Sequence, residues 1–199
     1  MNRIKVSGVV TTPATMSHEV YGEKFYKFDF TCERESGTVD VLPCIVSELY
    51  IDKINEGDSL TIIGKIRTRN VQDENGKSHC EIKVFVSELA DFEYACNEVE
   101  IKGVICKQPK LRNTPLGREI TDLLVASNRE RSHKSDYIPC ITWGRNAIRT
   151  SLMKVSDKVK VFGRFQSREY VKRYENDVEE IKTALEVSVN IISEVADES

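Results

Sequence analysis

The chain has 199 residues, of which 31% are charged and 40% hydrophobic, a composition typical of folded globular proteins rather than disordered ones. No apolar run approaches the roughly 18 residues that a membrane-spanning helix needs, and residues 1–15 lack the apolar core of a signal peptide. We therefore expect a cytoplasmic protein.

The formal net charge of −3 hides a strong segregation of sign along the chain. Residues 1–96 carry a net charge of −5, residues 97–173 one of +9, and residues 174–199 one of −7. Such a basic block can be a solvated surface or the binding site of a polyanion. Charge alone leaves both interpretations open.

The sequence repeats itself at a nearly constant offset, which indicates two copies of one structural unit. Gly8 coincides with Gly103 at an offset of 95 residues, the Pro-Cys-Ile run at 43–45 coincides with 139–141, and Gly64 coincides with Gly163. The offset grows from 95 to 99 through small insertions, as connecting loops allow.

Each copy contains short alternating apolar runs that predict half-buried strands. Phe25, Phe28 and Phe30 alternate as core residues do. One helix interrupts the strands: it is expected over 145–155 in the second copy, and its counterpart over 47–54 in the first. The apolar face of the helix at 145–155 is assigned to Ala147, Ile148, Ser151, Leu152 and Val155.

Three strands, a helix and two further strands in each copy predict an all-β fold of two tandem five-stranded OB-type barrels with one short helix each. The first barrel is expected over residues 1–93 and the second over 97–199. The junction at 94–97 contains neither Pro nor Gly, so we expect the barrels to be close neighbours.

Neither catalysis nor metal binding is indicated. His18, His79 and His133 fall at unrelated positions of the repeat, and the serine-hydrolase and metalloprotease motifs are absent. Without a C-x-x-C pair, the six cysteines predict buried free thiols in a reducing compartment. We expect no enzyme activity, no catalytic residue, no cofactor and no metal site.

Nucleic-acid binding is better supported, because the second copy combines clustered cations with aromatic side chains. Cations track a phosphate backbone, and exposed rings stack on unpaired bases. The candidate rings are Tyr137, Trp143, Tyr170 and Phe165, of which Phe165 could equally be a core residue. The candidate cations are Arg112, Arg129, Arg131, Lys134, Arg145, Arg168 and Arg173, beside the further basic residues Arg118, Arg164 and Lys172.

Several segments together resemble the bacterial single-stranded DNA-binding protein family. In the second copy these are Asn-Thr-Pro-Leu-Gly at 113–117, Leu-Leu-Val-Ala-Ser-Asn-Arg at 123–129 and Tyr-Ile-Pro-Cys-Ile-Thr-Trp-Gly-Arg-Asn-Ala at 137–147. The first copy contributes 64–69, which include Arg67 and Arg69, and 73–77.

The resemblance implies single-stranded DNA wrapped on the barrel face, with bases stacked on Tyr137, Trp143 and Tyr170. Arg131 stands where the family often has a further aromatic residue. In the first copy the three stacking positions are occupied by Val41, Ser47 and Val71. We therefore expect the second copy to supply most of the affinity, and the first mainly to pack or dimerise.

Members of the family act as sets of four barrels, which implies a homodimer for a two-barrel chain, and they serve DNA replication, recombination and repair. They also recruit partner enzymes through an acidic tail that ends in Pro-Phe. This chain ends at 195–199 without that tip, so we expect no such recruitment. The alternative is a primosome-like or mobile-element protein whose barrels mainly bind another protein. Whether the natural ligand is DNA or RNA stays open.

Overall fold

The computed structural model describes residues 1–72, 76, 78–114, 116–130, 132–173 and 179–195, with the backbone alone for 172–173. The first copy contains β1 (Asn2–Val10), β2 (Thr15–Val20), β3 (Glu23–Glu33), β4 (Val39–Ser47), the 3₁₀ helix η1 (Glu48–Lys53), β5 (Ser59–Gln72) and β6 (Ser78–Asp91). The second contains β7 (Asn97–Ile105), β8 (Lys110–Asn113), β9 (Glu119–Asn128), β10 (Ser135–Trp143), α1 (Arg145–Ser151), β11 (Lys158–Arg173) and β12 (Glu179–Glu194).

Each copy closes into a barrel. In barrel one the pairing runs β1–β3–β4–β6–β5 and returns to β1, with β4 and β6 parallel and the other pairs antiparallel. In barrel two β7, β9, β10, β12 and β11 close in the same order. The prediction of two five-stranded barrels is confirmed.

Each barrel also has a short strand that the sequence analysis missed. β2 pairs with the outer part of β3, and β8 with β9, outside the closed ring. All six residues of β2 are exposed. A strand that buries no apolar face lacks the alternation by which strands are detected.

The barrel interiors are filled by the alternating apolar residues of the ring strands. Phe28 and Phe30 are buried, as predicted. Phe165 is fully buried as well, so its assignment as a possible stacking ring is wrong. It follows Val159, Val161 and Gly163 at a spacing of two along β11, and these residues are buried as well.

The helix α1 is shorter than predicted, because it ends at Ser151 rather than at 155. Its buried residues are Ala147 and Thr150. Ala147 of the predicted apolar face is therefore buried, but Ile148, Leu152 and Val155 are exposed, so only part of that face packs on the core. In the first copy the predicted helix is a 3₁₀ helix, capped by Ser47, whose hydroxyl accepts a hydrogen bond from the backbone N–H of Leu49.

The repeated glycines mark places where two strands of a barrel come close. A Cβ atom on Gly8 would lie 2.0 Å from the carbonyl oxygen of Thr31, and one on Gly103 would lie 2.4 Å from that of Ala126. Both distances are far below van der Waals contact. Glycine is therefore required where β1 and β7 cross to β3 and β9.

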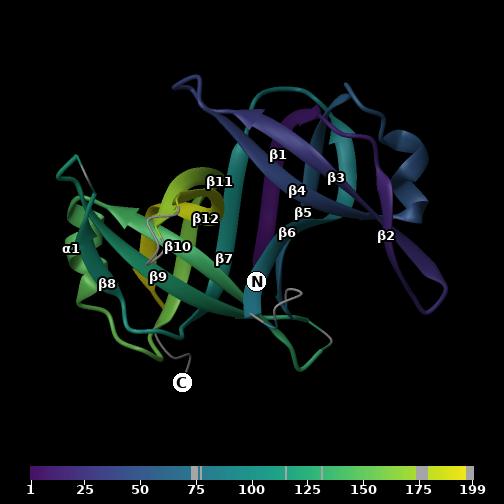
Figure 1. The fold of residues 1–199 in the computed structure, drawn as a ribbon. Helices are drawn as coiled ribbons and strands as arrows, with labels where there is room; N and C mark the ends of the chain where they lie inside the picture. The colour runs from purple at the N-terminus through teal and green to yellow at the C-terminus, as the bar shows by residue number, and fades with distance from the viewer. Residues whose placement is uncertain (73–75, 77, 115, 131, 174–178, 196–199) are drawn as a thin grey trace.

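The two barrels are joined by antiparallel pairing of β1 with β7, which lie side by side at the centre of the molecule (Figure 1). The register is centred on Ile4 and Val99, which are equivalent positions of the repeat. Ser7 donates its N–H to the carbonyl of Cys96, and Lys102 donates to that of Met1. The chain is thus a pseudo-twofold pair of barrels.

Two buried aspartates reinforce this junction. Asp136 of barrel two accepts hydrogen bonds from the backbone N–H of Thr68, at 2.9 Å, and from the side chain of Arg67, at 2.7 Å, both in barrel one. Asp40 of barrel one likewise accepts from the N–H of Ser167 in barrel two, at 2.7 Å. Each aspartate is fully buried.

The six cysteines are free, and three of them are buried: Cys32, Cys44 and Cys140. Burial raises the pKa of Cys32 to about 11. The prediction of burial fails for Cys80, which is exposed, and Cys96 and Cys106 are half-buried. In the described part of the chain, no helix is long and apolar enough to cross a membrane.

Candidate functional site

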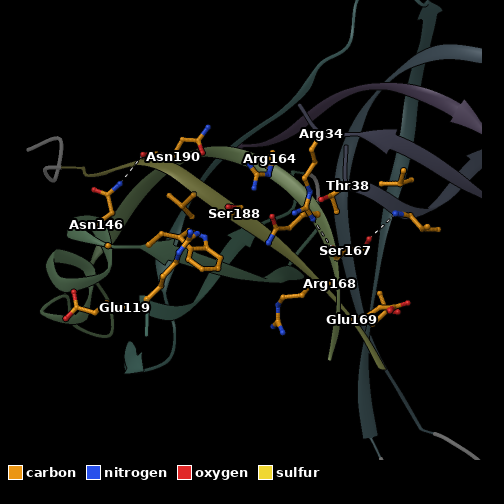
Figure 2. Close-up of a pocket in the computed structure, with 18 residues that line it drawn as sticks. Arg34, Thr38, Glu119, Asn146, Arg164, Ser167, Arg168, Glu169, Ser188 and Asn190 are labelled. Carbon is orange, nitrogen blue, oxygen red and sulfur yellow. Dashed lines mark hydrogen bonds between the residues drawn. The ribbon is translucent and has the colours of Figure 1, made fainter. Parts of the chain in front are cut away.

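A groove with a volume of about 1170 Å³ lies on the outer face of barrel two, where β11 and β12 meet the β3–β4 hairpin of barrel one. Figure 2 shows Arg34 and Thr38 of barrel one beside Arg164 and Ser167 of barrel two. Its lining includes Arg34, Val41, Arg118, Trp143, Arg164 and Arg168. Both copies therefore build this site.

Trp143 is the last residue of β10 and pairs with Ile120 of β9. Immediately after it Gly144 turns the chain with a φ of +55°, in the left-handed region that favours glycine. The N–H of Gly144 donates to the carbonyl of Glu119. This turn holds the half-buried indole at the edge of the groove.

A hydroxyl chain fixes α1 behind that turn. Thr142 of β10 and Thr150 of α1 are fully buried, with their oxygens 2.7 Å apart. Thr121 donates its hydroxyl to the carbonyl of Ala147, at 2.8 Å. Buried hydroxyl groups are normally hydrogen-bonded. These bonds hold α1 against β9 and β10, and so they support Trp143 at the end of β10.

Two buried polar atoms in the groove have no hydrogen-bond partner among the described residues, namely Nε of Arg164 and Oε1 of Gln166. Both residues line the groove on β11. An unpaired polar atom at such a place calls for a water molecule or a ligand.

Charge in the groove favours an anion. Four arginines line it, whereas Glu119 and Glu169 are its only acidic residues among those described. Part of the positive charge is internally paired: Arg168 donates to Glu186, at 3.1 Å, and Arg34 pairs with Asp40. Arg118 and Arg164 are the groove arginines for which the structure gives no ion pair among the described residues.

Barrel one contributes more to this site than the sequence suggested. Val41 lines the groove of barrel two, and its backbone N–H donates a hydrogen bond to the hydroxyl oxygen of Ser167, 2.9 Å away. Val41 of barrel one is therefore part of the wall of the groove on barrel two. The expectation that the second copy supplies most of the affinity stays a prediction.

The other two predicted stacking rings lie outside the lining of this groove. Tyr137 is 49% exposed and Tyr170 is 38% exposed, as expected for platforms. Tyr137 and Trp143 stand six residues apart on β10 and hence on one face of the strand. The guanidinium of Arg168 lies 5.7 Å from the centre of the Tyr170 ring.

Several predicted cations serve the protein itself. Arg129 donates to Asp136 at 2.7 Å and to the carbonyl of Thr68 at 2.9 Å, and Arg67 shares the same aspartate. The sequence analysis placed both residues among the candidates for DNA binding, but they share one buried carboxylate at the barrel junction. Arg112 is similarly paired with Asp122, at 3.0 Å.

The remaining predicted cations are scattered. Lys134 is exposed beside the loop that precedes β10, and Arg145 is exposed at the start of α1. Arg69 is exposed and lies on barrel one, 3.4 Å from Glu81. Arg131 and the side chain of Arg173 lie outside the described residues.

The sequence analysis missed Arg34 and Gln166. Arg34 could have been found, because it matches Arg129 at the offset of 95 residues. It repeats the same bonds: Arg34 donates to the carbonyl of Ser167 at 3.0 Å. No sequence signal identifies Gln166. Among the described residues, no cluster of three His, Cys, Asp or Glu side chains could hold a metal ion.

Comparison with known proteins gives consistent matches. The model of the single-strand binding protein family matches residues 96–194. Single-stranded DNA-binding protein A of Bacillus subtilis is 35% identical over 80 residues, 37% of this chain and 46% of that protein. Single-stranded DNA-binding protein B of the same organism is 34% identical over 80 residues, 37% of this chain and 71% of that protein. The chain thus spans about half the length of several curated relatives.

Among solved structures, wild-type single-stranded DNA binding protein from Thermus aquaticus superposes with a TM-score of 0.75 at 19% identity. The superposition covers 100% of this chain and 95% of that one. At this identity the likeness concerns the fold, and it extends over both barrels.

Proposed function

The chain belongs to the single-strand binding protein family, and from that premise we propose that it binds single-stranded DNA without catalysing a reaction on it. The observation that carries the proposal is the groove of barrel two, in which Trp143 stands beside Arg118 and Arg164. A ring for stacking and cations for phosphate are the two requirements of sequence-independent binding. The role that follows is coating or protecting single strands during replication, recombination or repair in the cytoplasm.

In the proposed complex, bases stack on Trp143 in the groove and on the exposed rings of Tyr137 and Tyr170 beyond it. Arg118, Arg164 and Arg168 pair with phosphates, with Lys134, Arg145, Arg131 and Arg173 as further candidates along the path. Phe165 takes no part, because it is buried. Arg67 and Arg129 act first as links between the barrels.

We propose that two chains associate, so that the assembly presents four barrels to one strand. Exposed apolar side chains on and after α1, such as Ile148 and Leu152, are consistent with a further contact surface. The mass of the protein in solution tests this: we expect twice the 22.7 kDa of the chain. A monomer across the working concentration range would contradict it.

The central experiment is a titration of oligo-dT, oligo-U and duplex DNA. Trp143 is the only tryptophan of the chain, so its fluorescence reports directly on the groove. We expect quenching and tight binding with oligo-dT and much weaker binding with duplex, since pairing hides the base faces. Equal affinity for duplex and single strands would refute the proposal, and the oligo-U arm decides between DNA and RNA.

Salt dependence separates this function from binding of another protein. The logarithm of the affinity should fall with the logarithm of the salt concentration, with a slope of about −0.7 for each phosphate contacted on a single strand. A slope near zero would favour the protein-binding alternative.

A further inference from the structure

Barrel one has its own groove, which the pseudo-twofold relation places opposite the groove of barrel two. It has a volume of about 390 Å³. Its walls include Arg67, Thr68 and Arg69 of β5, which match Gln166, Ser167 and Arg168 of the larger groove at an offset of 99 residues. Arg129 of barrel two reaches into it as Arg34 of barrel one reaches into the other.

This groove contains aromatic rings, although the three family stacking positions in barrel one hold no ring. His18 lies on Phe25 with ring centres 5.1 Å apart and planes 13° from parallel. Phe25 in turn contacts Phe85, with ring centres 5.9 Å apart. The three residues form a continuous aromatic cluster that lines the groove.

The rings of this cluster stand at positions that barrel two fills differently. Phe85 pairs with Lys65 on β5, and Ser188 pairs with the equivalent Arg164 on β11. Phe85 therefore replaces a serine. His18 pairs with Phe25, as Arg112 does with the equivalent Ile120. Barrel one has no ring at Val41, Ser47 or Val71, but it has rings on β2 and β6.

The cluster is accessible from solvent. His18 is exposed and Phe85 is half-buried, whereas Phe25 is buried beneath them. Because Phe25 covers one face of the imidazole, the outward face of His18 is available to a planar group. The guanidinium of Arg67 lies 6.0 Å from the centre of the Phe85 ring, which gives the cluster a cationic edge.

Positive charge surrounds the cluster. Arg69 and Lys83 line the groove together with the single acidic residue Glu81 among its described lining. Burial raises the pKa of the Glu81 carboxyl group. The neighbouring Lys83 and Arg69 lower this pKa by more, so that it lies below its ordinary value. Glu81 is therefore ionised and offsets one of these two cations, which leaves the groove with a positive excess.

We infer that barrel one holds a second nucleotide-binding site, in which a base stacks on His18 and Phe85 while Arg69 and Lys83 contact the flanking phosphates. Aromatic stacking beside cations is the chemistry that captures single-stranded nucleic acid. The site rests on the function proposed above. With this second site, both barrels contact the strand through aromatic rings, which stand at different positions of the fold. The first copy then contributes more to the affinity than the sequence analysis expected.

The direct test follows the three histidines of the chain by proton NMR during titration with oligo-dT. A His18→Gln variant identifies the His18 ring signals. We expect the His18 ring protons to move upfield as a base stacks on the imidazole. An unmoved His18 signal at saturation of the Trp143 fluorescence change would overturn the inference and leave the proposed function intact.

A variant series gives the second measurement, on the full chain. Phe85→Leu keeps apolar volume and removes the ring, and Phe85→Ser introduces the residue of barrel two. We expect each to weaken oligo-dT binding about 5- to 150-fold, the range of one base-stacking contact. Phe162→Leu is the matched control, because Phe162 is also half-buried but lines neither groove; its affinity should stay unchanged.

Thermal melting tests whether each variant still folds. If Phe85→Ser does not fold, the affinity of Phe85→Leu for oligo-dT is the deciding measurement. Wild-type affinity in Phe85→Leu contradicts the second site. Failure of both the Trp143 and the His18 signals to respond would instead refute the proposed function together with this inference. A response of His18 without one of Trp143 would support the site in barrel one and exclude the groove of barrel two.

Discussion

Asp40 and Asp136 occupy equivalent positions of the two barrels, and each is buried against the backbone of the other barrel. Asp40 accepts the N–H of Ser167, and Asp136 accepts that of Thr68. An arginine of the same barrel completes each pair: Arg34 bonds Asp40, and Arg129 bonds Asp136. Separate barrels would lose these cross-barrel bonds, so the full chain is the object on which binding should be measured.

Replacing Asp136 by alanine should destabilise the chain strongly. The substitution leaves Arg67 and Arg129 without their shared carboxylate and the N–H of Thr68 without its acceptor. Breaking a buried ion pair costs about 3–5 kcal/mol. Urea unfolding measures the loss. Asp122→Ala is the control, since its pair with Arg112 is about 40% exposed and should contribute less than about 1 kcal/mol.

Phe165→Ala should lower stability without removing a DNA contact. The side chain is fully buried, and truncating a buried phenylalanine typically costs about 3–5 kcal/mol. Calorimetry gives the stability, and oligo-dT titration at a temperature where the variant is folded gives the affinity. Weakened binding by a variant of unchanged stability would contradict the placement of this ring in the core.

Trp143→Ala should weaken oligo-dT binding by about 1–3 kcal/mol, the range of one base-stacking contact. The half-buried indole lines the groove while the turn at Gly144 and α1 are held by other bonds. Fluorescence anisotropy of labelled oligo-dT replaces the lost intrinsic signal. A variant that melts far lower yet binds as before would mean that Trp143 is a core residue.

Tyr170→Ala should produce a loss of the same size by the same mechanism, because the ring is 38% exposed and flanked by Arg168. Nearly unchanged melting is expected, because the ring lies at the surface and not in the buried core. The anisotropy assay checks the affinity. An affinity equal to that of the wild type would place the strand elsewhere on barrel two.

Arg118→Ala should flatten the salt dependence of binding by about 0.7, the contribution of one phosphate contact on a single strand, and leave base preference unchanged. Arg168→Ala should show the same flattening together with a lower melting temperature. The difference arises because Arg168 bonds Glu186, which is 6% exposed and would lose that partner. Titrations at several salt concentrations, run beside thermal melts, compare the two. An unaltered slope in Arg118→Ala would remove this residue from the binding site.

Much of the fold was predictable because repetition and alternation are local properties of the sequence. The recurrence of Gly8 at Gly103 reflects a steric demand that each barrel makes at the same crossing. The burial of Phe28 and Phe30 followed from period-two spacing, whereas Phe25, three residues before Phe28, lies under His18 in the groove of barrel one. The edge strands β2 and β8 were missed because strands without a buried face leave no alternating pattern.

The binding residues were less predictable than the fold, because the sequence shows which side chains are charged but not which partners they pair with. Two copies, the basic block and the candidate rings Tyr137, Trp143 and Tyr170 can be read from the sequence alone. The three-dimensional fold was needed to show that Phe165 is enclosed, that Arg129 is bonded to Asp136, and that His18 and Phe85 both contact Phe25. Contacts between strands far apart in sequence depend on barrel closure and on the β1–β7 junction, which no local pattern encodes.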